Sequence, residues 1–109
     1  MAYDHQLAER IRKGLARRKG IQSKAMFGGM GFLINGNMMV GVWKTSLIAR
    51  LGVEDGNSAL REPHVRPMDM TGKPMKGWIM VSPAGLLRDA DLQQWLDRAM
   101  RYVKTLPAK

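Results

Sequence analysis

The apolar positions of the first twenty residues repeat with the period of a helix. Tyr3, Leu7, Ile11 and Leu15 recur every four residues and form one narrow apolar stripe. Gly20 follows a basic last turn, as is typical of a helix C-cap with cations near the negative end of the helix dipole. The pattern therefore predicts an amphipathic helix over residues 3–19.

From residue 23 to residue 51 the period shortens to that of β-strands. Short apolar runs over residues 25–27, 31–34, 38–43 and 47–49 alternate with turn residues. Asn35-Gly36, between two of these runs, is a strong hairpin signal because both central residues of such a tight turn need positive φ. This stretch predicts an antiparallel meander of three or four strands. Its glycines at positions 28, 29, 31 and 41 indicate bulges or close approach of the backbone.

The second half of the chain predicts a short helix, a strand and a long helix. Residues 54–61 favour the short helix, which Glu62-Pro63 would end. Residues 64–74 hold two prolines and one glycine and indicate an ordered loop or an irregular edge, and residues 75–81 predict a strand. Asp89 is expected to cap the last helix. The apolar positions of this helix are Leu92, Trp95, Leu96, Ala99, Met100 and Val103.

These elements predict an α+β fold within a single domain, residues 1–109. A single-layer sheet must cover its apolar face, so we expect an antiparallel sheet of about five strands with the N- and C-terminal helices packed on it. The composition of the 109 residues, 45% hydrophobic and 25% charged, is that of a globular domain and excludes disordered and fibrous chains.

The absence of cysteine excludes disulfides, thiolate metal sites and a cysteine nucleophile. No run reaches the roughly 20 apolar residues that a membrane span needs. The N-terminal residues also lack the apolar segment of a secretory signal. We therefore expect a cytoplasmic protein with no membrane association.

The chain is basic, with a formal charge of +9, and much of the excess lies near its start. Residues 1–24 hold seven of the 18 cations against two of the nine carboxylates. A phosphate-binding face for nucleic acid is one interpretation, and a solvated face that promotes solubility is the other. The few aromatic side chains are expected to be buried, which argues against stacking on single strands. The cations proposed for nucleic acid are Arg10, Lys13, Arg17, Arg18 and Lys19.

The residues that could carry catalysis or hold a metal are few. His5 and His64 are the two histidines, and His64 could pair with Asp69, but no nucleophile stands at a diagnostic spacing. Three methionines at 68, 70 and 75 resemble a thioether copper site, with adaptable packing as the alternative. The glycines of residues 27–31 precede a strand rather than a helix, so they are not a phosphate loop. We expect no catalytic centre, no bound metal and no cofactor.

Several stretches together resemble the N-terminal domain of the TfoX/Sxy competence regulators, in its short single-domain branch. They are Met26-Phe-Gly-Gly-Met-Gly-Phe32, Asn35-Gly-Asn-Met38, Leu47-Ile-Ala-Arg50, Glu62-Pro-His-Val-Arg-Pro-Met-Asp69 and Thr71-Gly-Lys-Pro-Met-Lys-Gly-Trp78. The resemblance implies an antiparallel sheet with flanking helices and a non-enzymatic, regulatory role. The regulators themselves carry a second, C-terminal domain that this sequence does not contain. What the resemblance transfers is therefore the fold and an adaptor or regulatory character.

The last two of these stretches also suggest a partner site. Arg66 precedes a proline, which holds its backbone extended, so its guanidinium could reach Asp69 or an outside anion. Lys73 and Lys76 flank the second proline and would form a cationic rim. Trp78, in the strand that follows, is either a core residue, which is the interpretation we favour, or the apolar centre of a partner site.

Two hypotheses result. In the first, the protein is a regulatory domain that binds another protein through Arg66, Asp69, Lys73 and Lys76 and forms a homodimer if a strand edge is open. In the second, its N-terminal cations bind nucleic acid, directly or through a partner. An enzyme that uses His64 and Arg66 on a small anion is the least favoured interpretation.

Overall fold

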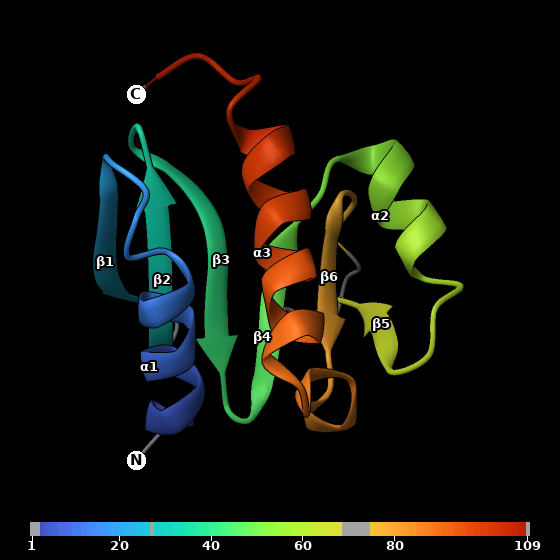
Figure 1. Ribbon diagram of the computed structural model, residues 1–109. Helices are drawn as coiled ribbons and strands as arrows, with labels where there is room; N and C mark the ends of the chain where they lie inside the picture. Colours follow the sequence, from blue (N-terminus) through green and yellow to red (C-terminus); the bar gives the residue numbers. More distant parts are fainter. Residues whose placement is uncertain (1–2, 27, 69–74, 109) are drawn as a thin grey trace.

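The computed structural model describes residues 3–26, 28–68 and 75–108. The chain forms three α-helices and one sheet. The elements are α1 (His5–Gly14), β1 (Ile21–Met26), β2 (Gly29–Ile34), β3 (Asn37–Trp43), β4 (Ser46–Arg50), α2 (Val53–Ala59), β5 (Val65–Pro67), β6 (Trp78–Val81), the 3₁₀ helix η1 (Pro83–Leu86) and α3 (Asp89–Val103). Figure 1 shows α1 and α3 in front of this sheet and α2 beside its β6 end.

The six strands form one sheet in the order β1-β2-β3-β4-β6-β5, and every neighbouring pair is antiparallel. Helices α1 and α3 lie side by side on one face (Figure 1). This arrangement confirms the predicted α+β class with terminal helices on an antiparallel sheet. The sheet has one strand more than expected because residues 65–67, within the stretch predicted as a loop or irregular edge, pair with β6.

The hairpin between β2 and β3 forms where the sequence predicts it. Asn35 and Gly36 both adopt positive φ, 54° and 81°, as a two-residue turn with the twist of the flanking strands requires. The register between these strands shifts between Phe32 and Leu33, next to Gly31 and not at one of the predicted glycines themselves. Gly29 is a point of close approach, since a Cβ there would overlap the carbonyl oxygen of Val42 on β3.

Helix α1 is shorter than predicted. Asp4 caps its start by accepting hydrogen bonds from the backbone N–H groups of Gln6 and Leu7. The helix ends at Gly14 rather than at residue 19. Its apolar stripe is nevertheless correct, because the side chains at positions 7, 11 and 15 are buried. Residues 16–20 are all exposed, so no burial extends the helix there.

The main core lies between the sheet and helices α1 and α3. All six apolar positions predicted for the last helix are buried on α3. The predicted cap is wrong, however. Asp89 is the first residue of α3, no side chain caps this helix, and the Asp89 carboxylate accepts a hydrogen bond from Arg10 instead.

The strand predicted over residues 75–81 begins only at Trp78. The short helix predicted over residues 54–61 is observed as α2, which begins one residue earlier, at Val53, and ends two residues earlier, at Ala59. Within the described part of the chain, no helix has both the length and the hydropathy needed to cross a membrane.

Candidate interaction sites

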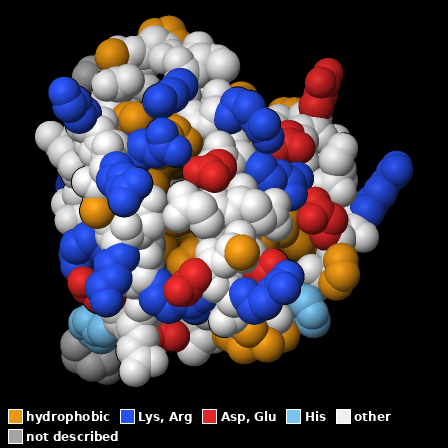
Figure 2. All heavy atoms as spheres, viewed as in Figure 1, with side chains coloured by type: hydrophobic (Ala, Val, Ile, Leu, Met, Phe, Trp, Pro, Cys, Tyr) orange, Lys and Arg blue, Asp and Glu red, His pale blue; other side chains and the backbone are white. Residues whose placement is uncertain are grey.

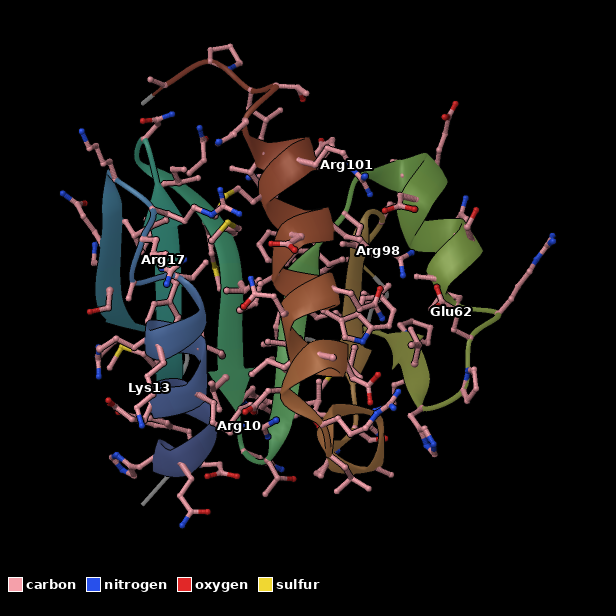
Figure 3. All side chains as sticks on the ribbon, in the orientation of Figure 1. Arg10, Lys13, Arg17, Glu62, Arg98 and Arg101 are labelled. Atoms are coloured by element: carbon pink, nitrogen blue, oxygen red, sulfur yellow. The ribbon has the colours of Figure 1, made fainter. Side chains whose placement is uncertain are left out.

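The predicted nucleic-acid cations lie on the helix side of the molecule, where Figure 2 shows many Lys and Arg side chains. Arg10 and Lys13 stand on α1, whereas Arg17, Arg18 and Lys19 belong to the exposed connection to β1. Figure 3 labels three of these cations, Arg10, Lys13 and Arg17, and shows them along this side of the molecule. Lys13, Arg17 and Arg18 line one hollow on this side, although the five cations do not lie on one helix.

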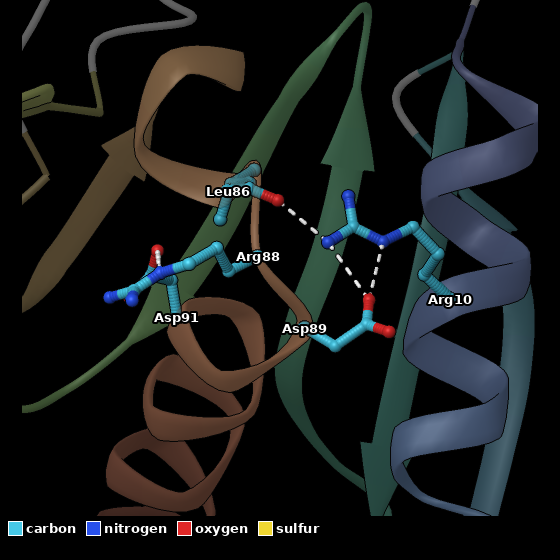
Figure 4. A network of polar contacts seen from close by, with 5 residues as sticks. All are labelled: Arg10, Leu86, Arg88, Asp89 and Asp91. Carbon is cyan, nitrogen blue, oxygen red and sulfur yellow. Dashed lines mark hydrogen bonds and ion pairs between the residues drawn. The ribbon is translucent and has the colours of Figure 1, made fainter.

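Two of these five cations are engaged within the protein. Arg10 donates from its Nη2 to the carbonyl oxygen of Leu86 at 2.6 Å and pairs with Asp89 at 3.2 Å (Figure 4). Arg18 forms an ion pair with Asp97 of α3 at 3.6 Å. These contacts join α1 and its exit to η1 and α3, so the local excess of positive charge is smaller than the sequence suggests.

A shallow hollow of about 520 Å³ lies between the end of α1 and α3. Lys13, Arg17, Arg18 and Gln93 line it, beside Gly14. Lys13 and Arg17 make no ion pair with any described residue, so they remain available to an outside anion.

Arginine ion pairs neutralise much of the helix side. Besides the pairs of Arg10 and Arg18, Arg88 pairs with Asp91 at 3.1 Å, and its hydrogen bond lowers the pKa of the Asp91 carboxyl. Arg98 of α3 donates to Glu62 at 2.9 Å and to Asp55 at 3.3 Å. Arg12 pairs with Glu9 on α1 itself. Six of the nine carboxylates are thus held by arginines on or beside the helices.

The strands have a different charge pattern. Lys24, Arg50 and Arg66 are their three cations, and residues 21–26, 29–34, 37–43, 46–50, 65–67 and 78–81 contain no aspartate or glutamate. The sheet therefore carries positive charge without the neighbouring carboxylates that the helices have.

The predicted partner site lies at the β5–β6 side of this sheet. Arg66 is exposed on β5 opposite Met80 of β6, and Lys76 is exposed in the turn before β6. The structure therefore brings these two predicted cations to neighbouring elements. Asp69 and Lys73, the other two predicted residues, lie outside the described residues, as does the proposed contact between Arg66 and Asp69.

A second, small apolar cluster lies on the sheet apart from the main core. Ile48, Met68 and Met80 are buried in it, and Trp43 and Trp78 pack against it while remaining half-buried. Trp78 thus packs on this small cluster and not in the main core, so the favoured core interpretation holds only in part. The expectation that the aromatic side chains are buried fails for both tryptophans, because the helices do not cover this cluster.

Each of these two tryptophans has a cation over its ring. Lys44 lies 4.7 Å from the ring centre of Trp43, and the guanidinium carbon of Arg50 lies 5.4 Å from that of Trp78. Arg50 was not among the predicted site residues, because an arginine at a strand end is usually solvated. The signal for it was its place in the stretch 47–50, on which the family resemblance partly rests.

The histidine-based alternative gains no support from the geometry. His64 is exposed and adopts φ 68° in the turn before β5, and its proposed partner Asp69 lies outside the described residues. Among residues 3–26, 28–68 and 75–108, no three His, Asp or Glu side chains come close enough together to hold a metal ion.

Comparison with known protein families gives a match over nearly the whole chain. The model described as TfoX N-terminal domain matches residues 13–103. The chain belongs to the TfoX N-terminal domain family. This family is not a known enzyme family and supports a regulator-like character. Neither the curated proteins nor the solved structures gave a significant match.

Proposed function

We propose that this member of the TfoX N-terminal domain family is a cytoplasmic regulatory domain that acts by binding an acidic surface of a protein partner, without catalysis. One observation carries the proposal. Half-buried Trp43 and Trp78 flank a small apolar cluster on strands that contain cations and no carboxylate. Aromatic side chains beside arginines are the groups that protein interfaces favour.

The proposed contact surface is defined by Trp43, Trp78, Arg50, Arg66 and Lys76. Its apolar centre would supply buried area, and its cations would orient a partner that carries carboxylates. We also expect Asp69 and Lys73 to belong to this surface, as the sequence indicates.

A capture experiment tests this assignment. The tagged protein is incubated with cytoplasmic extract beside two variants of equal charge, Arg66→Gln/Lys76→Gln and Lys13→Gln/Arg17→Gln. We expect one protein to be retained by the wild type and by the helix-side variant and lost with the sheet-side variant. Loss with both variants, or loss after nuclease treatment, would contradict the proposal.

Nucleic-acid binding through the helix side is the alternative, and the hollow beside Lys13 and Arg17 is the observation in its favour. In that case affinity for duplex DNA would fall steeply as the salt concentration rises. Neutralising Lys13 and Arg17 would reduce the slope of log affinity against log salt concentration by about 2. The internal ion pairs of Arg10 and Arg18 make this the second choice.

We further propose that two copies pair through β1. This strand is an edge of the sheet, and its residues 22–25 are exposed. An unpaired edge of this length can template a second strand, whereas β5, the other edge, is three residues long and ends in proline. Light scattering that gives a dimer, converted to a monomer by Ser23→Pro, would support the pairing. A monomer at high concentration would refute it.

A further inference from the structure

Arg50 lies over two aromatic rings. It ends β4 and stands opposite Trp78 of β6 in the sheet register. Its guanidinium carbon lies 5.4 Å from the ring centre of Trp78 and 6.0 Å from that of Tyr102 on α3. Contacts with ring faces restrict a planar cation while leaving the N–H donors on its edge free.

No described residue accepts a hydrogen bond from the Arg50 side chain or forms an ion pair with it. Arg10 and Arg98, which are also partly buried, both hold carboxylates. Arg50 therefore differs from the arginines that tie the helices together. A guanidinium packed over aromatic rings with free donors on its edge has the geometry that binds carboxylate or phosphate in bidentate fashion.

A cavity of about 70 Å³ lies beside Arg50, and Lys76 is also among its lining residues. About 10–15 Å³ of such space holds one water, so the cavity accepts a group the size of a carboxylate or a phosphate. Within the described residues that line it, the charged side chains are Arg50 and Lys76, both cationic.

The wall of this cavity is built from closely packed backbone. Gly52 and Gly77 both have φ 84°, and the N–H groups of Leu51 and Gly52 donate to the carbonyl oxygen of Gly77 at 2.8 and 3.2 Å. A Cβ on Gly52 would lie 2.6 Å from the ring of Tyr102. These contacts fix the wall, so the cavity exists without a ligand.

We propose that this pocket binds a single oxyanion, with Arg50 as its bidentate receptor and Lys76 as the second positive charge. The oxyanion is either a carboxylate on the partner of the proposed function or free phosphate. In the first case the inference rests on that function and assigns the partner an acidic side chain that enters the pocket.

The test is an NMR titration of the ¹⁵N-labelled protein with sodium phosphate and with sodium acetate, each against sodium chloride at equal ionic strength. We expect saturable shifts of the Trp78 indole N–H and the Arg50 Nε–H, and none of the Trp43 indole N–H. Saturation by phosphate alone identifies free phosphate as the source, and saturation by acetate identifies a carboxylate. Shifts that match those with chloride would overturn the proposal.

Two variants and a matched control locate the binding. Arg50→Gln should lower the affinity for the anion at least tenfold, since it removes charge-assisted hydrogen bonds. Lys76→Gln changes an exposed turn residue, so the fold should stay intact while the affinity for the anion falls several-fold. Lys44→Gln removes an equal charge from over the other half-buried tryptophan and should leave binding unchanged. Equal effects of Lys44→Gln and Lys76→Gln would refute the assignment.

The two proposals fail separately. If neither anion binds saturably while Arg66→Gln/Lys76→Gln still abolishes capture of the partner, the pocket assignment is wrong and the proposed function stands. If the anions bind at Arg50 while no protein is captured, the pocket stands and the proposed function is wrong.

Discussion

Arg98 is predicted to contribute more to stability than any exposed cation on the same helix. It lies on α3 and reaches Asp55 of α2 and Glu62, which follows α2 in the chain. Figure 3 labels Arg98 and Glu62. Its side chain is 16% exposed, and its guanidinium carbon lies 4.4 Å from the ring centre of Trp95. Burial lowers the pKa of Arg98, while hydrogen bonds to Glu62 and Asp55 raise it and prevail, so the charged form is favoured.

The cost of Arg98→Met follows from these contacts. A buried hydrogen bond to a charged group contributes about 1.5–3 kcal/mol. The two carboxylates are 41% and 39% exposed, so water replaces part of each bond, and we take less than half of the summed value. The contact with Trp95 adds about 0.5–1 kcal/mol, and the apolar stem of methionine recovers a similar amount. The net loss is about 2 kcal/mol, which lowers Tm by roughly 10 °C in a domain of this size.

Urea denaturation followed by circular dichroism measures this loss. Arg101→Met is the matched control, because Arg101 is exposed on the same helix and pairs with no described residue. It should change stability by less than about 0.5 kcal/mol. A double-mutant cycle with Glu62→Gln should give a coupling of about 1 kcal/mol between Arg98 and Glu62. A loss for Arg98→Met no larger than that for Arg101→Met would refute the reasoning.

Three further predictions concern packing, the C-terminal segment and pH. Gly29→Ala should lower the free energy of unfolding by more than about 2 kcal/mol, because the added Cβ would overlap the backbone of β3. Gly14→Ala adds a Cβ that meets only the ends of side chains, so it should change this free energy by no more than about 1 kcal/mol. Equal urea midpoints for the two variants would contradict this. Asn37→Ala removes a hydrogen bond of 2.9 Å to the carbonyl oxygen of residue 107, so trypsin should cleave after Lys104 several-fold faster than in the wild type; an unchanged rate would contradict it. The pKa of Asp91 is lower in the folded state, so its stabilisation is present at neutral pH and lost as the pH falls below about 4. Asp91→Asn should therefore make the decline of the urea midpoint below that pH shallower, and an unaltered decline would count against it.

The local elements were predictable from the sequence because nearest-neighbour chemistry decides them. The turn at Asn35-Gly36 needs two residues that tolerate positive φ, and the chain supplies them between two apolar runs. The stripe of α3 is buried at all six predicted positions, since a spacing of three and four places them on one face. The family resemblance rested on the same local signals and is confirmed over residues 13–103.

The ends of elements and the site were decided by tertiary contacts. The sequence predicts Asp89 as a helix cap, yet its carboxylate accepts a hydrogen bond from Arg10, 79 residues earlier in the chain. β5 is too short to recognise alone and exists because β6 supplies its hydrogen bonds. Arg50 and Trp78 are 28 positions apart and meet only because β4 pairs with β6, while Tyr102 reaches them from α3. Local propensity carries no information about such pairings, because they depend on which distant strands and helices share a core. The amino-acid pattern alone therefore determined the elements and the class of fold, and the packing of the sheet with its helices decided which cations are neutralised and which remain free to bind.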